Sequence, residues 1–249
     1  MKGVKKMLAV ALLSVTALLA TAQEQLVVKL NDGTKVAYNI DYVKQMMYED
    51  KSHVEKSYVD LGLSVKWATC NVGASSPEDF GDYFAWGETT GYNSGKANFE
   101  WSTYTLCGGS DKTMTKYCTS SSYGTVDNKR TLELSDDAAY ANWGGSWRMP
   151  TDGEMGELIN KCTWIWTTQN GVNGYKVTGT NGNSIFLPAA GYIADTRLIF
   201  AGRFGEYHSS SLHKSYSYCA RCMDFSNSKV YVSDIYPRYY GRSVRPVCP

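Results

Sequence analysis

Two cysteines near the C-terminus are the residues whose spacing most directly suggests chemistry. Cys219 and Cys222 form a C-x-x-C pair within the segment YSYCARCMDF. Redox-active pairs of this kind usually lie at the start of a helix, where the thiolate is stabilised. This segment instead has the aromatic content of a strand, in which side chains three residues apart point to opposite faces. We therefore expect the two sulfurs to share neither a disulfide nor a copper ion unless a bulge intervenes.

His208 and His213 are the other residues in this region that could bind a metal or transfer a proton. A spacing of five residues fixes no shared geometry for them, and a metal would need further ligands. The sequence contains neither H-E-x-x-H nor G-x-S-x-G, and no glycine loop typical of phosphate binding. We therefore predict no catalytic residue, no metal and no cofactor, and we interpret both histidines as polar surface contacts.

Tyrosine and serine dominate the C-terminal part of the chain, which favours a binding face over a catalytic site. Residues 203–249 hold nine serines and seven tyrosines. Tyrosine offers a rigid apolar surface with a polar tip, and with serine it forms a mixture typical of paratopes and of sugar-binding surfaces. The residues expected to form one exposed ligand-binding patch are Tyr207, His208, His213, Tyr216, Tyr218, Asp224, Tyr231, Tyr236, Arg238 and Tyr239. The alternative is a tyrosine-rich sheet packed for stability.

The alternation of side chains along a strand divides the C-terminal segment between core and solvent. Met223 and Phe225 share one parity and are expected in the core. Asp224 has the other parity and is expected to point to solvent. Since each buried hydroxyl would need a hydrogen-bonding partner, we expect several of the tyrosines to stay exposed.

The first 22 residues have the organisation of a signal peptide. Lys2, Lys5 and Lys6 precede an apolar run over residues 7–20, and Ala-Thr-Ala at residues 20–22 supplies the small residues that a signal peptidase recognises. The apolar run is short for a membrane span. We predict cleavage after Ala22, export to the periplasm, the medium or the outer cell surface, and a mature chain that does not span a membrane.

The charge balance excludes partners that need a strongly basic protein. The chain has 25 lysines and arginines and 24 acidic residues, and removal of the three lysines of the signal peptide leaves 22 against 24, a net charge of −2. A nucleic-acid-binding protein needs a basic stripe, which this balance does not supply. We predict a glycan or a protein at the cell surface as the partner, and no nucleic acid.

The pattern along the mature chain predicts a small arm and one larger domain. Two β-rich runs flank Asn-Asp-Gly within residues 26–40, which is typical of a tight hairpin. We assign residues 23–48 to this N-terminal hairpin arm, 49–57 to a linker and 58–249 to the domain. A hairpin alone is too small to fold stably, so it must pack on something or act as an arm.

Within the domain, many short strands and one long loop are expected. Residues 80–90, FGDYFAWGETT, have the composition of an aromatic strand, and TWIWTT, GYKVTG and SIFLPAAGY predict three further strands separated by Asn-Gly turns. Residues 87–130 are polar and rich in glycine, serine and threonine, so we expect mostly loop. A disulfide between Cys107 and Cys118 could brace it, although the pairing among seven cysteines stays open.

Two helices are predicted among these strands, which places the domain in the α+β class. The first is expected to begin near Ser135 and to end at Gly144. For the second, Thr151 and Glu154 have the spacing of a capping box. The apolar residues that follow at helical spacing predict one buried face: Met155, Leu158, Ile159 and Cys162. We also expect Trp147 to be buried.

Several segments of residues 58–249 closely resemble a large set of secreted Bacteroidetes proteins that belong to, or lie beside, the Fibrobacter succinogenes major paralogous domain family. These segments are YVDLGLSVKWATCNVGA, GDYFAWGET, NWGGSWRMPT, CTWIWTTQNGVNGYKVT, SIFLPAAGY and YYGRSVRPV. Trp147–Thr151 with its capped helix is also similar to the R-L-P-T-E-x-E-W motif of formylglycine-generating (sulfatase-modifying-factor) proteins, which have a C-type-lectin-like fold. Variable proteins of diversity-generating retroelements share that fold and carry their ligand face near the C-terminus.

The resemblance implies an exported C-type-lectin-like domain that binds or adheres. His208 departs from the pattern, because the family commonly has tryptophan there. The formylglycine-generating enzymes use two cysteines near the C-terminus, and Cys219 and Cys222 lie in a loosely comparable region. Their spacing is shorter and the surrounding residues do not match, so we do not transfer catalysis to them.

We therefore expect a secreted or cell-surface recognition or adhesion module that binds a glycan or protein through its tyrosine- and serine-rich face. The first alternative is a thiol oxidase that uses Cys219 and Cys222. The second is a pilus-type surface-assembly subunit, in which the N-terminal hairpin pairs with a partner strand.

Overall fold

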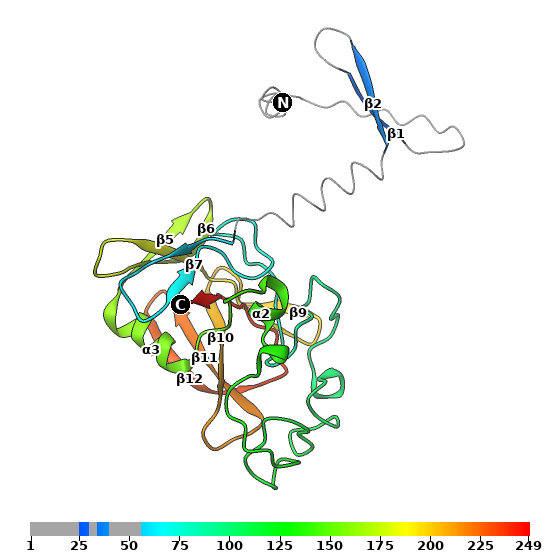
Figure 1. The fold of residues 1–249 in the computed structure, drawn as a ribbon, viewed down its shortest axis with the longest axis vertical. Coiled ribbons are helices and arrows are strands. Elements are labelled where there is room, and N and C mark those ends of the chain that lie inside the picture. Colours follow the sequence, from blue (N-terminus) through cyan, green and yellow to red (C-terminus); the bar gives the residue numbers. More distant parts are fainter. Residues whose placement is uncertain (1–24, 30–33, 40–55) are drawn as a thin grey trace. The chain divides into compact units, whose positions relative to one another are not determined.

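A computed structural model describes residues 25–29, 34–39 and 56–249 (Figure 1). The predicted signal peptide and nearly all of the predicted linker lie outside the described residues. The chain divides into two units, Met1–Val54 and Glu55–Pro249. In the first unit, β1 (Gln25–Lys29) and β2 (Lys35–Asn39) pair as antiparallel strands, with Val27 opposite Ala37. Within the described residues, no helix is both long and apolar enough to cross a membrane.

The second unit is an α+β domain, as expected from the sequence. Its helical elements are the 3-10 turns η1 (Trp101–Thr103) and η2 (Leu134–Asp136) and the helices α2 (Ala138–Trp143) and α3 (Asp152–Lys161). Its strands are β3 (Tyr58–Val59), β4 (Lys66–Ala68), β5 (Thr163–Gln169), β6 (Val172–Thr178), β7 (Ser184–Pro188), β8 (Tyr192–Ala194), β9 (Arg197–Ile199), β10 (Phe204–Leu212), β11 (Cys219–Ser226), β12 (Lys229–Pro237) and β13 (Val247–Cys248).

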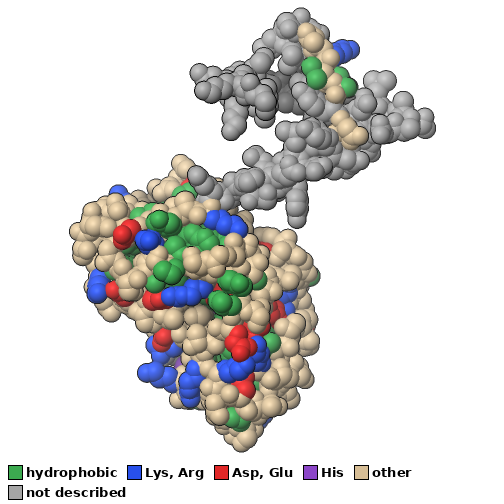
Figure 2. Space-filling model, viewed as in Figure 1, with side chains coloured by type: hydrophobic (Ala, Val, Ile, Leu, Met, Phe, Trp, Pro, Cys, Tyr) green, Lys and Arg blue, Asp and Glu red, His purple; other side chains and the backbone are tan. Residues whose placement is uncertain are grey.

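These strands form four small antiparallel sheets. The sheets have the orders β5-β6-β7, β10-β11-β12, β13-β4-β3 and β8-β9. The three strands predicted from TWIWTT, GYKVTG and SIFLPAAGY are β5, β6 and β7. Because β13 pairs with β4, the C-terminal end of the chain closes the domain against its beginning. Figure 2 shows apolar side chains gathered over the region of β5 to β7, with charged groups interspersed around them.

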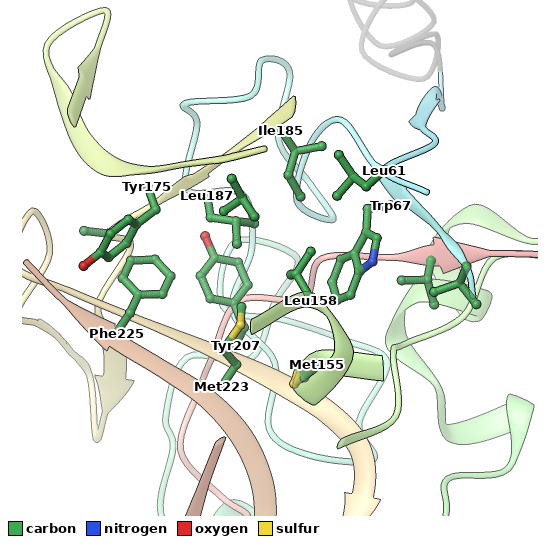
Figure 3. Packing of buried hydrophobic residues seen from close by; sticks show 14 residues of the cluster. Leu61, Trp67, Met155, Leu158, Tyr175, Ile185, Leu187, Tyr207, Met223 and Phe225 are labelled. Atoms are coloured by element: carbon green, nitrogen blue, oxygen red, sulfur yellow. The ribbon is translucent and has the colours of Figure 1, made fainter. Parts of the chain in front are cut away.

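The largest hydrophobic core lies between α3 and the sheets β5-β6-β7 and β10-β11-β12 (Figure 3). Met155 and Leu158 of α3 are fully buried there, as their helical spacing predicts. Tyr175 packs edge-on against Phe225, with ring centroids 5.3 Å apart. Burying such rings removes a large apolar area from water, at roughly 25 cal/mol per Å². Cys162 ends the helix and is half-buried against this core.

The N-terminus of α3 is fixed by the capping box that the sequence predicts. Thr151 Oγ1 accepts from the backbone N–H of Glu154 at 3.2 Å, and Glu154 Oε2 accepts from the backbone N–H of Thr151 at 2.8 Å. Arg148 also donates to Glu154 at 2.8 Å. Trp147 is 8% exposed and packs edge-on against Trp143, so its predicted burial is confirmed.

The start of α2 differs from the sequence prediction. Residues 134–136 form a 3-10 turn, and the cap is Asp137, whose carboxylate accepts from the backbone N–H of Tyr140 at 3.0 Å. Ser135 therefore lies before the helix. The second carboxylate oxygen of Asp137 also accepts from the backbone N–H of Met149 at 2.8 Å. This additional hydrogen bond connects the start of α2 to the segment that follows the helix and favours Asp137 as the cap.

The predicted aromatic strand at residues 80–90 is absent as a strand and forms one isolated bridge, Phe84 to Arg242. Tyr83 packs into one apolar cluster, and Phe84 and Trp86 into another. All three rings are buried, so this segment runs through the interior, whereas an ordinary strand at a sheet edge alternates between core and solvent.

Arg238 braces the long loop of residues 87–130, where a disulfide was considered from the sequence. Cys107 and Cys118 are both free thiols. The Arg238 guanidinium is fully buried and donates to the carbonyls of Tyr117 at 2.9 Å and Lys116 at 3.1 Å. It also donates to Tyr104 Oη at 3.0 Å. Several segments of the loop are thus gathered around one planar, permanently charged donor group.

Candidate functional site

The sheet β10-β11-β12 has an apolar face that belongs to the core. Tyr207 lies opposite Met223, and Met223 lies opposite Val232. Met223 and Phe225 are buried, which confirms the sequence prediction. Tyr207 is also fully buried: its hydroxyl donates to the carbonyl of Pro188 at 2.7 Å, and its ring stacks on Phe225 with centroids 5.8 Å apart. The expectation that Tyr207 lies on an exposed face is therefore wrong, because its parity places it with Met223.

The opposite face of the same sheet is polar. The register aligns two rows of residues across the three strands, Glu206–Asp224–Tyr231 and His208–Cys222–Ser233. Every residue of the two rows except Tyr231 is buried. Two acids and a thiol thus lie below the protein surface on adjacent strands, an arrangement that needs compensating charge and hydrogen bonds.

Arg242 supplies the compensating charge. Its Nε donates to Glu206 Oε2 at 2.8 Å, and the two side chains are only 1% and 7% exposed. Burial alone would lower the pKa of Arg242, but Cys222, Glu206 and Asp224 raise it, so the guanidinium stays charged. We call Glu206, Asp224 and Arg242 the charge centre.

Asp224 is the acid of this centre that lacks a full partner. Its Oδ1 accepts a weak hydrogen bond from the Cys222 thiol at 3.3 Å, while its Oδ2 is buried without a hydrogen-bonding partner. Burial, and next the negative charge of Glu206, raise the pKa of Asp224 to about 7, although Arg242 acts in the opposite direction. Asp224 is 4% exposed, so the expectation that it points to solvent is wrong. It has the predicted parity, but other segments of the chain cover that face.

Five partly exposed tyrosines surround the charge centre, and we call them the tyrosine ring: Tyr192, Tyr231, Tyr236, Tyr239 and Tyr240. The Arg242 guanidinium carbon lies 4.8 Å from the centroid of Tyr236 and 5.4 Å from that of Tyr240, within the range of cation–π attraction. Burial, followed by the charge of Glu206, raises the pKa of Tyr192. The phenols therefore lie around the same charges and present one polar-tipped aromatic surface.

Ring contacts extend this surface in two directions. Tyr239 packs against Trp101 with centroids 4.7 Å apart and against Tyr240 at 4.5 Å. Tyr240 is 5.4 Å from Tyr192, and Tyr192 is 6.2 Å from Phe200, which is 46% exposed. The result is a continuous row of aromatic side chains that come from four separate segments of the chain.

A second group of rings contains three more of the predicted site residues, Tyr216, Tyr218 and His213. Tyr216, 41% exposed, lies 5.6 Å from Tyr218 and 6.5 Å from Tyr123. His213 stacks on Tyr216 at 5.0 Å, but its Nδ1 accepts from the backbone N–H groups of Ser215 and Tyr216. His213 is therefore buried as a turn-stabilising residue. The single patch expected from the sequence is replaced by these two groups.

His208 and Arg238 are also inside the domain, so their predicted exposure is corrected. His208 Nε2 lies 3.0 Å from the carbonyl of Phe84, and burial lowers the pKa of the imidazole to about 3, which keeps it neutral. Arg238 is enclosed by the rings of Trp86 and Tyr104 and by the loop carbonyls described above. Both residues hold segments together that are more than a hundred positions apart in the sequence.

The two thiols of the C-x-x-C pair do not form a disulfide. Both lie on β11, which is a strand as the sequence predicts. Burial raises the pKa of Cys219 to about 12, and burial with the nearby Asp224 raises the pKa of Cys222 well above its usual value. Both thiols are therefore protonated near neutral pH and lack the thiolate that a redox-active cysteine needs. In the described part of the chain, no three His, Cys, Asp or Glu side chains are placed to hold a metal ion.

Sequence reasoning missed Glu206, Arg242, Tyr192 and Tyr240. Glu206 has the parity of His208 and was detectable from alternation along one strand. The other three come from β8 and from the turn and bridge segment that follows β12, and local sequence contains no signal that brings them together. The long-range pairs Gly191 to Gly205 and Tyr207 to Ser243 place these segments beside β10. The pair Ile193 to Gly241 joins the two segments to each other.

A surface depression of about 310 Å³ is separate from this site. It is lined by Val59, Thr69, Pro77, Gln169, Lys176, Ser184, Ile185 and Phe186. Its lining includes one charged side chain, that of Lys176, and none of the residues of the charge centre or the tyrosine ring. Comparison of the chain with protein-family models, curated proteins and solved structures found no match.

Proposed function

We propose that this chain is an exported recognition module that binds a glycan through the tyrosine ring. The observation that carries the proposal is the convergence of five partly exposed phenols around the buried charge centre, with Arg242 in contact with two of the rings. The phenol group of a single tyrosine offers a flat apolar face to the C–H side of a sugar and a hydroxyl at its edge. The extension of the row to Trp101 and Phe200 would serve an oligosaccharide of several sugar units.

The location and fold family belong to the same proposal. The charged start, apolar run and Ala-Thr-Ala of residues 1–22 support export. The resemblance of segments such as NWGGSWRMPT, and the capped helix α3 that follows this segment, support a C-type-lectin-like domain. In this account the ligand face lies near the C-terminus, on β12 and the segment after it.

The thiol-oxidase alternative receives no support from the environment of the sulfurs, since burial holds both cysteines in their protonated form. The surface-assembly alternative would use the hairpin of β1 and β2. No contact within the described residues favours it over glycan binding.

The proposal is tested by binding of the full chain to an array of bacterial and host glycans, followed by a matched pair of variants. Tyr231 and Tyr140 are each 37% exposed, but only Tyr231 belongs to the tyrosine ring. Tyr231→Ala should weaken binding to the best glycan by roughly thirtyfold, the effect of a dominant contact residue worth about 2 kcal/mol. Tyr140→Ala should bind as the wild-type protein does. Equal binding by both variants would contradict the proposed site.

A further inference from the structure

We infer that the tyrosine ring encloses a subsite for the hydroxyl groups of a neutral sugar, built by Asp224 Oδ2 and Arg242 Nη2. The inference rests on the proposed glycan-binding function and adds the class of ligand: uncharged sugars with adjacent hydroxyls, in preference to uronic acids and amino sugars. Tyr231, which stands directly opposite Asp224 in the register, would form the entrance.

Two buried atoms point to a ligand at this position. Asp224 Oδ2 and Arg242 Nη2 are both inaccessible to solvent, and neither has a partner in hydrogen-bonding geometry among the described residues. The Ser233 side chain lies close enough to the Asp224 carboxylate to favour its ionised form. Their residues are 4% and 1% exposed. The other atoms of the same groups are used, since Arg242 Nε binds Glu206 and Asp224 Oδ1 accepts from Cys222. Buried polar atoms are almost always paired in folded proteins, so two orphaned atoms in one cluster need an explanation.

The chemistry of the two atoms selects a hydroxyl group. A guanidinium nitrogen can only donate a hydrogen bond, and an ionised carboxylate oxygen can only accept one. A hydroxyl does both, so one hydroxyl or an adjacent pair can satisfy Asp224 Oδ2 and Arg242 Nη2 together. The phenol rings around them would contact the apolar face of the same sugar.

Charge excludes the ionic relatives of such a sugar. Glu206 already balances Arg242 at 2.8 Å, which leaves the ionised form of Asp224 as the excess charge of the centre. The carboxylate of a uronic acid would accept from Arg242 but would meet Asp224 as a like charge. The ammonium of an amino sugar would pair with Asp224 but would meet the guanidinium. In a site of low dielectric, each such encounter is strongly unfavourable.

Access requires a small movement at the entrance. Tyr231 is 37% exposed and lies at the start of β12, so its phenol has solvent on one side into which it can turn. The Lys229 Nζ, 4.8 Å from the centroid of the Tyr231 ring, lies on the same part of the strand. We therefore place the entrance to the subsite at Tyr231.

The titration of Asp224 makes the subsite sensitive to pH. The charged and titratable groups that face Asp224 are Glu206 on β10, Cys222 on β11, Tyr231 and Tyr236 on β12, and Arg242. Because Asp224 has a pKa of about 7, its carboxylate is ionised at pH 8 and protonated at pH 5. Charge-assisted hydrogen bonds are roughly twice as strong as neutral ones, so sugar binding should weaken as the pH falls.

The test compares the full chain with matched probes, using an array-positive glycan as the reporter. Methyl glucoside, methyl glucuronide and methyl 6-amino-6-deoxyglucoside, whose amine is largely protonated at pH 8, compete with the reporter at pH 8 and pH 5. The corresponding galactose and mannose trios are tested in the same way. A neutral member should compete at least tenfold better than its charged relatives at pH 8 and lose about tenfold at pH 5. Asp224→Asn should bind the neutral sugar about tenfold more weakly at pH 8 and show no dependence on pH.

Several results would overturn the subsite. In the competition experiment, these are stronger competition by a uronide or an amino sugar, or no competition by any neutral sugar. Wild-type binding that does not change between pH 5 and pH 8 is another. The last is a glycan complex in which only a water molecule joins Asp224 and Arg242. If Tyr231→Ala still weakens glycan binding about thirtyfold, such a result removes the subsite and leaves the proposed function intact. A chain that binds no glycan of the array contradicts the proposed function itself.

Discussion

Glu206 and Asp224 lie directly opposite each other on β10 and β11, and both carboxylates are buried on the same face of the sheet. One guanidinium, that of Arg242, serves the pair, and it is hydrogen-bonded to Glu206. Two neighbouring buried acids with one cation cannot both be ionised without cost, and the uncompensated charge falls on Asp224. This relationship links the stability of the domain to the same residue that we place in the ligand subsite.

Replacement of Asp224 by Asn should stabilise the protein at high pH. The pKa of Asp224 is about 7 in the folded chain, against about 3.9 in the unfolded chain. The folded state therefore binds more protons between these values, and the stability contributed by this residue is lost as the pH rises from 4 to 7. Asp224→Asn should remove that loss, on the order of 2 to 4 kcal/mol at pH 8.5 and near zero at pH 4, measured by urea denaturation.

Asp195→Asn is the matched control for this titration. Asp195 is exposed and has a positive φ of 53°, a conformation that asparagine also adopts readily. Its substitution should change stability by less than about 0.5 kcal/mol at either pH. A gain for Asp224→Asn that is the same at pH 4 and pH 8.5 would mean that Asp224 is not the titrating group.

We expect Arg238 to be required for the stability of the fold and not to contact the ligand. Lysine cannot reproduce the planar group that donates to Tyr117, Lys116 and Tyr104, so Arg238→Lys should cost at least about 3 kcal/mol of unfolding free energy. Chemical denaturation with Arg203→Lys, at an exposed position, gives the comparison. If Arg238→Lys leaves the stability unchanged but removes glycan binding, Arg238 belongs to the ligand face, as predicted from the sequence.

The capping box of α3 gives a smaller and local effect. Thr151→Ala removes the acceptor of the Glu154 N–H and should lower stability by about 1 kcal/mol. Thermal denaturation should show this as a lower melting temperature, whereas Thr196→Ala, in an exposed turn, should leave it unchanged. The capping assignment is wrong if both variants melt with the wild-type protein.

The cysteines should react with iodoacetamide in the order of their exposure and acidity. Cys107 is half-buried and should be labelled in the native protein, whereas Cys219 and Cys222 are buried with raised pKa values and should be labelled only after unfolding. Peptide mass spectrometry after timed labelling at pH 8 measures this order. Rapid labelling of Cys219, or a disulfide between Cys219 and Cys222 after mild oxidation, would favour the thiol-oxidase alternative.

Local sequence signals predicted those features that depend on neighbours along the chain. The spacing of Thr151 and Glu154 determines the cap of α3, and the parity of Met223 and Phe225 determines their burial, because each depends only on helix or strand geometry. The α+β class follows in the same way, from two local helix patterns set among short strand patterns.

Features that depend on distant segments could not be predicted. The parity of Asp224 was correctly assigned, but its burial depends on Arg242 and on the tyrosines that return from β8 and from the turn after β12. His208 and Arg238 were expected on the surface because polar residues usually lie there. Their partners, such as the carbonyls of Phe84 and Tyr117, are more than a hundred residues away.

The structure of the full chain bound to the glycan that ranks first on the array tests the central claim most directly. We predict that sugar units stack on the phenols of the tyrosine ring. One sugar hydroxyl should lie within hydrogen-bonding distance of both Asp224 Oδ2 and Arg242 Nη2, in the typical range of about 2.5–3.2 Å. A sugar bound instead at Tyr123, Tyr216 and Tyr218, or in the depression beside Lys176, would contradict it.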